Sequence, residues 1–218
     1  MLLQVAQRLY FEDQKLFLRN TANNEYQETR RRSDYLFGAG AVLTDTLNVR
    51  ADAQFNPQSR RTNRLSAGFR WQPQRLATLS ASYRYERDPR AFDNPNYFRE
   101  NPTASDNGRE RVSVTTQWPL SNKVFALGRV DYSLQEKRST QTIFGMEYKG
   151  ECCWAARFVV QRYAVSAQKS NSAVFFQLEL SGLGAVGPDP MKMLRERIVG
   201  YEPITPTSSE TTTFERYE

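Results

Sequence analysis

The sequence contains no histidine, and its only cysteines form one adjacent pair. The lack of histidine excludes Ser-His-Asp and Cys-His catalytic sites, zinc sites with histidine ligands, and most schemes of general acid–base catalysis that are built on imidazole. We therefore name no catalytic residue, no metal ligand and no cofactor.

Long apolar runs are also missing. No stretch approaches the roughly 20 apolar residues of a membrane-spanning helix, and Gln4 and Arg8 follow residues 1–3 too closely for a signal peptide. The chain is polar, with a mean hydropathy of −0.69, and is long enough for one large domain or two small ones. The net charge of +6 is spread along the chain, so it only weakly indicates an anionic partner and does not indicate nucleic acid.

Cys152 and Cys153 are poorly placed to bond to each other. The Cα atoms of adjacent residues lie about 3.8 Å apart, whereas an unstrained disulfide needs roughly 4.4–6.8 Å. If the two cysteines are oxidised, their partners lie on another polypeptide or on a part of the protein outside this sequence. The alternative is a pair of buried free thiols in a cytosolic protein, because free cysteine packs as a small apolar residue.

The dominant feature that is present is an alternation of apolar and polar residues in segments of about ten residues, which predicts β-strands. In the segment 141–148, for example, Phe144 and Met146 alternate with Gly145 and Glu147. About ten strands are predicted, at residues 2–12, 34–43, 47–55, 64–71, 76–85, 111–118, 126–134, 141–148, 154–163 and 173–183.

Two architectures fit such strands: a soluble sandwich with one buried face, and a membrane barrel that is apolar outside and polar inside. The barrel is favoured because nearly every polar face carries arginine, aspartate, glutamine or serine, and because the strand lengths suit a tilted bilayer crossing. The connections also alternate in length, as they do in outer-membrane barrels. The long ones are predicted at 13–33, 56–62, 87–108, 135–139 and 167–172, and the short ones at 44–46, 72–75, 119–122 and 149–152.

The short connections are predicted to face the periplasm, which is oxidising and would contain the cysteine pair. Trp71, Trp118 and Trp154 all lie beside short connections and on apolar faces. They are predicted to form an aromatic girdle at the periplasmic interface; the alternative is a chance arrangement of three residues.

The pattern changes after residue 184. Met191, Leu194 and Ile198 have helical spacing and follow Pro188 and Pro190. They predict a short helix or a docking segment, with a core-facing helix as the alternative. The serine- and threonine-rich stretch 205–213 is predicted to be disordered.

Three segments resemble the LptD family of lipopolysaccharide-assembly proteins of Gram-negative outer membranes. They are residues 7–11, residues 175–184 and residues 147–163, and the most specific part is the run Cys152-Cys153-Trp154. The resemblance runs along the whole chain.

The resemblance implies an all-β fold, an antiparallel transmembrane β-barrel of about 26 strands, of which this chain supplies about the last ten. Residues 1–184 would be the C-terminal portion of the barrel and residues 185–218 a periplasmic tail. The missing first strand would meet the strand at 173–183 at a lateral gate. In this family the two C-terminal cysteines each pair with a cysteine of the N-terminal region, which would tie Cys152 and Cys153 to a periplasmic β-jellyroll domain.

The function implied by the resemblance is that of a translocon in the cell outer membrane, not an enzyme, which inserts lipopolysaccharide into the outer leaflet. The implied partners are lipopolysaccharide, the LptE lipoprotein plug, the LptA periplasmic bridge through the missing N-terminal domain, and outer-membrane lipids. The alternatives are a stand-alone barrel of about ten strands, of porin or adhesion type, and a soluble β-sandwich binding module.

Arginines on the predicted polar faces are candidates for attracting a phosphorylated saccharide in the barrel lumen. The alternative is that they balance Asp52, Asp131 and Glu147 in structural ion pairs. The six candidates are Arg50, Arg64, Arg70, Arg84, Arg129 and Arg157.

Overall fold

The computed structural model describes residues 1–7, 9, 11, 17–19, 25–27, 33–57, 60–88, 97–103, 108–151, 153–166, 169–180 and 183–205. The chain divides into two compact units. Unit 1 consists of residues 1–70, 81–113 and 132–138, and unit 2 of residues 71–80, 114–131 and 139–218.

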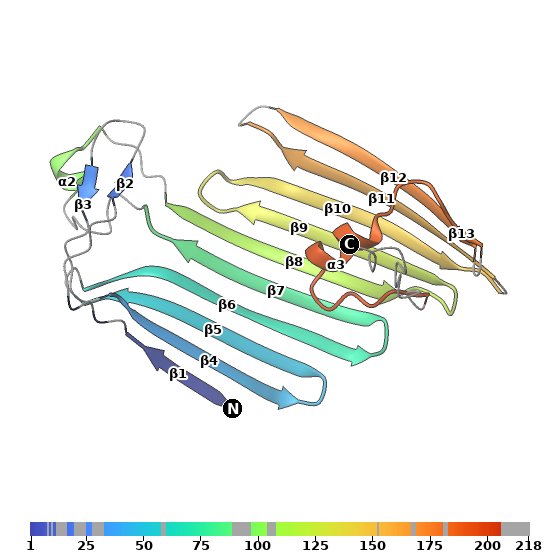
Figure 1. Cartoon of the computed structure of the whole chain (residues 1–218), viewed down its shortest axis with the longest axis horizontal. Helices are drawn as coiled ribbons and strands as arrows, with labels where there is room; N and C mark the ends of the chain where they lie inside the picture. Colours follow the sequence, from blue (N-terminus) through green and yellow to red (C-terminus); the bar gives the residue numbers. More distant parts are fainter. Residues whose placement is uncertain are drawn as a thin grey trace, which may run out of the picture. The chain divides into compact units, whose positions relative to one another are not determined.

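Eleven strands form one antiparallel sheet, and apart from β2 and β3 each strand is hydrogen-bonded to the next along the chain, from β1 through β4 to β13 (Figure 1). A separate two-stranded sheet pairs β2 (Phe17–Arg19) with β3 (Glu25–Gln27). The main sheet contains β1 (Leu2–Ala6), β4 (Tyr35–Thr44), β5 (Leu47–Asn56), β6 (Arg61–Gln74), β7 (Ala77–Glu86), β8 (Arg109–Pro119), β9 (Val124–Ser133), β10 (Arg138–Lys149), β11 (Trp154–Ala164), β12 (Ser170–Leu180) and β13 (Gly184–Val186). The described residues also form two short helices, α2 (Tyr97–Glu100) and α3 (Met191–Arg197).

The predicted alternation sets which face each side chain occupies. Along β10, Ile143, Gly145 and Glu147 are buried, whereas Phe144 and Met146 between them are exposed. The register pairs Phe144 with Val160 of β11, and Glu147 with Arg157, so residues of one kind stay on one face from strand to strand. The phase predicted for these strands is confirmed.

All ten predicted strands are present, but some details of the prediction were wrong. The first strand ends at Ala6, well before the predicted residue 12, and the last ends at Leu180. The two-stranded sheet and β13 were not predicted. The alternation in connection length is clear only before β4 and β8; the connections β5–β6, β9–β10 and β11–β12 are nearly as short as the others, because those strands extend further than their apolar pattern.

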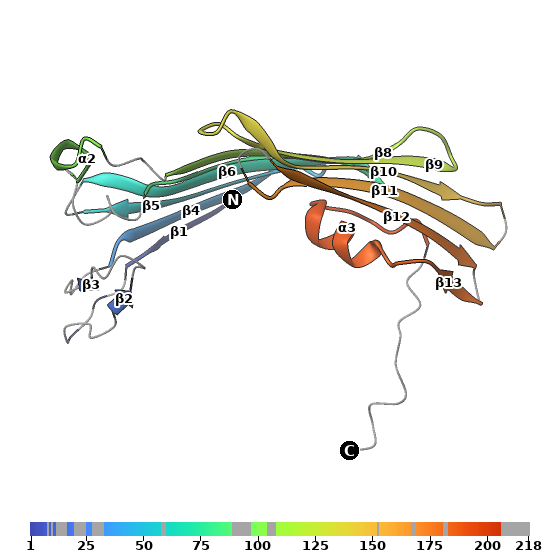
Figure 2. The same cartoon turned by 90° about the horizontal axis from the view of Figure 1, so that it is seen from above.

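The segment that follows β13 returns to the sheet. Figure 2 shows α3 on one face of the neighbouring strands of unit 2. Leu194 on α3, and Ile198 just beyond it, pack with Leu127, Ile143 and Val159 of the sheet in the largest buried apolar cluster described. The helical spacing around Leu194 therefore forms a helix that faces a core. No helix in the described ranges is long and apolar enough to cross a membrane.

Candidate functional site

One face of the strands in unit 2 is apolar and open. Phe144 is 54% exposed, Val174 62% and Phe176 57%, and each sits at an outward position of its strand. Phe158, 42% exposed, lies directly opposite Phe176 in the β11–β12 register. A continuous apolar surface of this kind marks contact with a membrane or with another protein.

The three tryptophans lie on this outward face of unit 2. The rings of Trp71 and Trp118 are in contact, with centroids 5.8 Å apart, and Trp154 packs on Tyr148 at 5.0 Å. Each tryptophan lies near a short connection, at the end of β6, the end of β8 or the start of β11. The aromatic girdle at the periplasmic interface stays a prediction.

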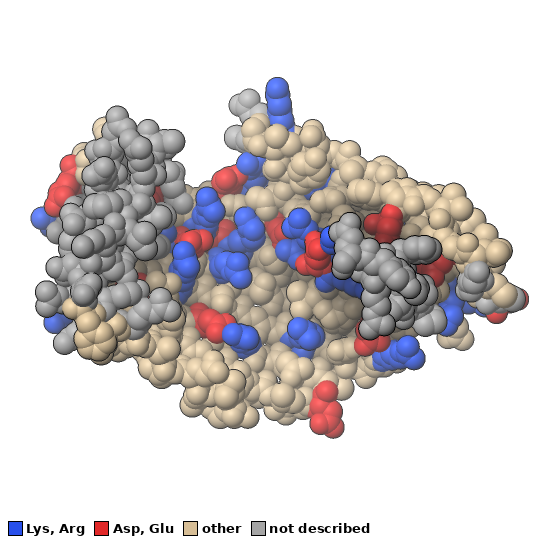
Figure 3. Space-filling model, viewed as in Figure 1, with Lys and Arg blue, Asp and Glu red and all other residues tan. Residues whose placement is uncertain are grey.

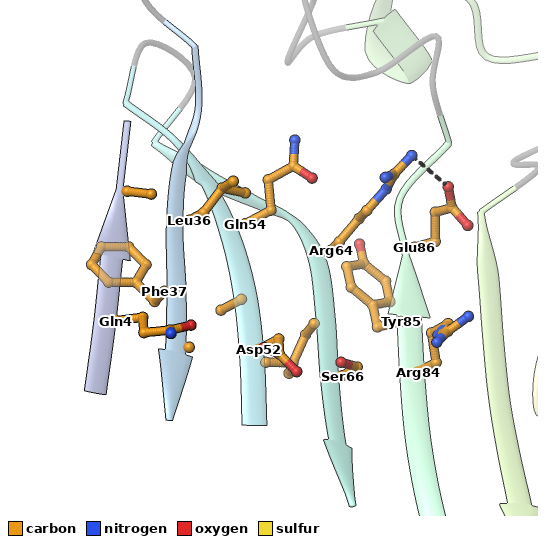
Figure 4. A pocket seen from close by; sticks show the side chains of 14 residues that line it. Gln4, Leu36, Phe37, Asp52, Gln54, Arg64, Ser66, Arg84, Tyr85 and Glu86 are labelled. Carbon is orange, nitrogen blue, oxygen red and sulfur yellow. Dashed lines mark ion pairs between the residues drawn. The ribbon is translucent and has the colours of Figure 1, made fainter. Parts of the chain in front are cut away.

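One face of the strands in unit 1 is polar, and an open pocket of about 620 Å³ lies on it, lined by polar and apolar residues. Figure 4 shows Gln54, Asp52, Arg64 and Arg84 projecting from β5, β6 and β7 toward this pocket. Gln54 Nε2 donates to Asp34 Oδ2 at 2.7 Å, which fixes its amide at the pocket edge. The pocket can therefore offer both cationic and hydrogen-bonding groups to a polar ligand.

Two of the candidate arginines in unit 1 are already paired. Arg64 lies 3.1 Å from Glu86, and Arg50 donates two hydrogen bonds to Asp52. Both pairs are largely solvent-exposed, so each contributes little to stability and can open to another anion. Arg70 and Arg84 are exposed, and no ion pair is found for either of them within the described ranges.

The polar face of unit 2 is different because its charges are buried. Arg157 and Glu147 are both 0% exposed, and Arg157 Nε donates to Glu147 Oε1 at 3.0 Å. Arg157 also donates to Glu179 at 2.5 Å and to Gln177 at 3.1 Å. A buried charge is tolerated only when it is paired and hydrogen-bonded, and here one guanidinium satisfies acceptors on two neighbouring strands.

Residues after α3 extend this network. Thr205 Oγ1 accepts a hydrogen bond from Arg157 at 2.8 Å, and the Tyr201 hydroxyl donates to Glu147 Oε1 at 2.6 Å. Burial, followed by the negative charge of Glu147, raises the pKa of Tyr201 above its ordinary value. The hydroxyl therefore keeps its proton, which the bond to Glu147 requires.

The ion-pair alternative is confirmed for all three acidic residues named from the sequence. Asp52 pairs with Arg50, Glu147 with Arg157, and Asp131, nearly buried, with Arg129 at 2.9 Å. Figure 3 shows basic and acidic side chains beside one another on the face that carries α3. Arg129 and Arg157 are therefore parts of the folded structure of unit 2, and the exposed arginines of unit 1 are the better candidates for a ligand.

Sequence reasoning missed the apolar residues on this polar face. Leu127, Ile143 and Val159 alternate in phase with Asp131, Glu147 and Arg157, which placed them in a predicted wet lumen. In the structure they are buried beneath residues 194–198. They could have been found by asking where Leu194 and Ile198, the apolar residues of the predicted helix, would find an apolar surface to pack against.

The cysteine pair lies at the β10–β11 connection, where the sequence placed it. Cys153 is among the described residues, while Cys152 lies outside them. The predicted pairing with cysteines of another region is thus still a prediction. Among the described residues, no group of three or more acidic or cysteine side chains could hold a metal ion.

Comparison with known proteins decides the family. A family profile described as LPS transport system D (LptD) matches residues 1–124, more than half of the chain. The chain belongs to the LptD family. Its two-faced antiparallel sheet is consistent with part of the β-barrel that the resemblance implies.

Curated LptD-family relatives match along nearly the whole chain. The LPS-assembly protein LptD of Bordetella avium is 45% identical over 99% of this chain and 27% of its own length, and that of Bordetella pertussis gives the same values. The Azoarcus protein of the same name is 36% identical over 92% of this chain and 22% of its own length. The chain thus spans about a quarter of the length of these relatives.

Proposed function

We propose that this chain is the C-terminal part of an outer-membrane translocon that inserts lipopolysaccharide into the outer leaflet. The observation that carries the proposal is the pairing of LptD-family membership with strands that are apolar and open on one face and polar on the other. Such strands suit a barrel wall between lipid and a polar lumen. The protein would act by transport and not by catalysis.

The pocket on the polar face of unit 1 supports a route for the saccharide. Arg84 and Arg64 supply positive charge at its wall, and Gln54 and Ser66 supply hydrogen-bonding groups. Phosphate groups attract such arginines. In this proposal Arg50, Arg64, Arg70 and Arg84 remain candidates, whereas Arg129 and Arg157 hold the fold of unit 2.

Within the described residues, the outer edge of β1 and most of the outer edge of β12 have no strand partner, which supports pairing with further strands. β1 pairs with β4 and β12 with β11, and only residues 178–180 of β12 pair with β13. An open strand edge is very costly in lipid. The lateral gate, predicted at the strand 173–183, would lie at β12 (Ser170–Leu180), where it would meet the first strand of the complete barrel.

Four partners belong to this proposal: lipopolysaccharide, LptE in the lumen, LptA through a domain at the other end of the relatives, and outer-membrane lipid. Trp71, Trp118 and Trp154 would mark the periplasmic interface, and Cys152 and Cys153 would join this part to the N-terminal domain in the oxidising periplasm.

A chimera tests the function. This segment replaces the aligned quarter of the Bordetella avium protein in a strain depleted of its own copy, and lipopolysaccharide at the cell surface is measured. The chimera is expected to restore surface lipopolysaccharide and to co-purify with LptE. A matched chimera carrying Phe176→Lys on the apolar face is expected to fail to assemble.

Two results would contradict the proposal. A chimera that assembles as a heat-modifiable barrel but delivers no lipopolysaccharide would remove the transport role. Linked-peptide mass spectrometry that finds Cys152 and Cys153 joined to no N-terminal cysteine in the assembled chimera would remove the proposed disulfides.

A further inference from the structure

The chain leaves β13 at a glycine and crosses the polar face of unit 2. Gly187 has φ 106°, and a Cβ built there would collide with the backbone oxygen of Phe176 on β12. Any other residue would be strained and would collide with β12. Residues 189–205, which we call the C-terminal latch, follow this turn; Figure 2 shows its helix α3 against the strands.

The latch is hydrogen-bonded to seven strands in succession. Gln117 forms the most complete contact: its Nε2 donates to the Glu202 carbonyl at 2.7 Å and its Oε1 accepts from the Glu202 N–H at 2.9 Å. The side-chain amide thus satisfies both backbone groups of one latch residue. The strand partners are Gln72 on β6, Thr78 on β7, Gln117 on β8, Arg129 on β9, Glu147 on β10, Arg157 on β11 and Gln177 on β12.

Apolar side chains of the latch bury apolar positions of the polar face. Leu194 is 0% exposed in the cluster already described, and Ile204 forms a second cluster with Phe125 and Ala155. Ala155 comes two residues after Cys153, so the latch also packs at the β10–β11 connection. Without the latch these apolar positions would face water, and the stabilisation gained by burying their surface would be lost.

The buried ion pair depends on the latch as well. Tyr201 donates a hydrogen bond to Glu147, and Thr205 accepts one from Arg157, so each member of the buried pair has a partner on the latch. Removing the latch would expose that pair to solvent and leave both side chains with fewer partners. Polar contacts and apolar contacts therefore hold the latch in the same place.

We propose that the C-terminal latch fastens β6 through β12 together from their polar face and closes that part of the face to solutes. The strands it joins lie next to one another in the sheet, so one segment secures six neighbouring strand pairs. Arg129 and Arg157 serve the latch: Arg129 donates to the Arg197 carbonyl, and Arg157 to Thr205. This inference concerns the fold and does not depend on what the protein transports.

Thiol labelling of two positions on one face of β7 tests the closure. Thr78, which is 1% exposed, lies against the latch at Val199, whereas Ser82, four residues further on, is exposed. Thr78→Cys and Ser82→Cys are made separately in the complete protein as the cell assembles it. The purified protein is treated with a maleimide, and labelling is followed by peptide mass spectrometry.

The expected result is that Thr78→Cys labels at least about tenfold more slowly than Ser82→Cys, because labelling requires the latch to open. Truncation after Gly187 should bring the two rates together. Truncation after Thr205 keeps every latch contact named above and should leave the difference unchanged. If the shorter protein does not assemble, Leu194→Asp in the full-length chain is the second variant and should also release Thr78→Cys.

Two outcomes would overturn the proposal. Equal labelling of Thr78→Cys and Ser82→Cys in the intact protein would show that the face is open. Slow labelling of Thr78→Cys that survives both truncation after Gly187 and Leu194→Asp would show that something other than the latch covers it.

Discussion

Replacing Arg157 by methionine should destabilise the protein more than any other loss of charge on the polar face. Methionine keeps much of the volume but leaves Glu147, 0% exposed, without its cation. Removing one partner of a buried ion pair costs about 3–5 kcal/mol. Arg157 also donates to Gln177, Glu179 and Thr205, so the upper half of that range is expected.

The assay is unfolding in urea of the complete protein in detergent micelles, followed by tryptophan fluorescence. Three variants define the effect: Arg157→Met, Glu147→Gln and the double variant. Because Glu147→Gln removes the charge that Arg157→Met leaves unpaired, the double variant should be more stable than the sum of the two single losses predicts, by at least about 1 kcal/mol. Arg84→Met is the matched control; it is exposed on a polar face, and its effect should lie within about 0.5 kcal/mol.

A loss below about 1 kcal/mol for Arg157→Met would refute this reasoning, because that is the value expected of an exposed ion pair. Additive losses in the double variant would also refute it, since they would mean that Arg157 and Glu147 do not interact in the folded protein.

Three further predictions concern the apolar face, the latch hydroxyl and the turn before the latch. Phe144→Lys should cost about 2–4 kcal/mol if Phe144 lies near the bilayer midplane, while Phe144→Leu should cost far less; urea unfolding in lipid bilayers measures both, and equal effects would contradict a lipid-facing position. Because the folded-state pKa of Tyr201 is raised, its contribution to stability should be complete below the unfolded value of about 10 and decline above it. Comparing urea midpoints from pH 8 to about 11 should show a steeper decline in the native chain than in Tyr201→Phe, and parallel profiles would contradict the assignment. Gly187→Ala should lower the thermal unfolding midpoint, because its Cβ would meet the Phe176 backbone oxygen. Gly40→Ala, whose Cβ would lie 3.9 Å from the Val49 backbone oxygen, should have a small effect; an unchanged midpoint for Gly187→Ala would show that the turn can relax.

The strands and their faces could be predicted because alternation is a local property. Phe144 and Glu147 are three residues apart, so their opposite faces follow directly from a period of two. The ion pairs of Asp52, Asp131 and Glu147 were foreseeable for a related reason: each lies on a polar face with an arginine within reach, two residues away on the same strand for Asp52 and Asp131, and directly opposite across β10–β11 for Glu147.

The latch could not be predicted in the same way, because its contacts are distant in sequence. Gln117 and Glu202 are 85 residues apart, and Gln72 and Glu202 are 130 apart. Thr205 was assigned to a disordered stretch from its composition, yet it is buried, at 8% exposure, against Arg157; the rest of that stretch lies outside the described residues. Composition predicts whether a segment is disordered by itself, whereas the position of Thr205 is set by its hydrogen bond with Arg157 on β11.

The six arginines proposed from one sequence pattern therefore belong to different physical situations. Arg157 and Arg129 are buried or nearly so, and moving them to a ligand would leave Glu147 and Asp131 as unpaired buried carboxylates, a cost that a surface phosphate contact would not offset. Arg50 and Arg64 are in exposed pairs that water already weakens, so exchanging a carboxylate for a phosphate is nearly neutral there. Arg84 and Arg70 would give up no ion pair found in the described part of the chain. If a phosphorylated saccharide passes over this face, exposed arginines without an ion-pair partner should bind its phosphate groups most readily. We expect Arg84, at the wall of the unit 1 pocket, to bind first.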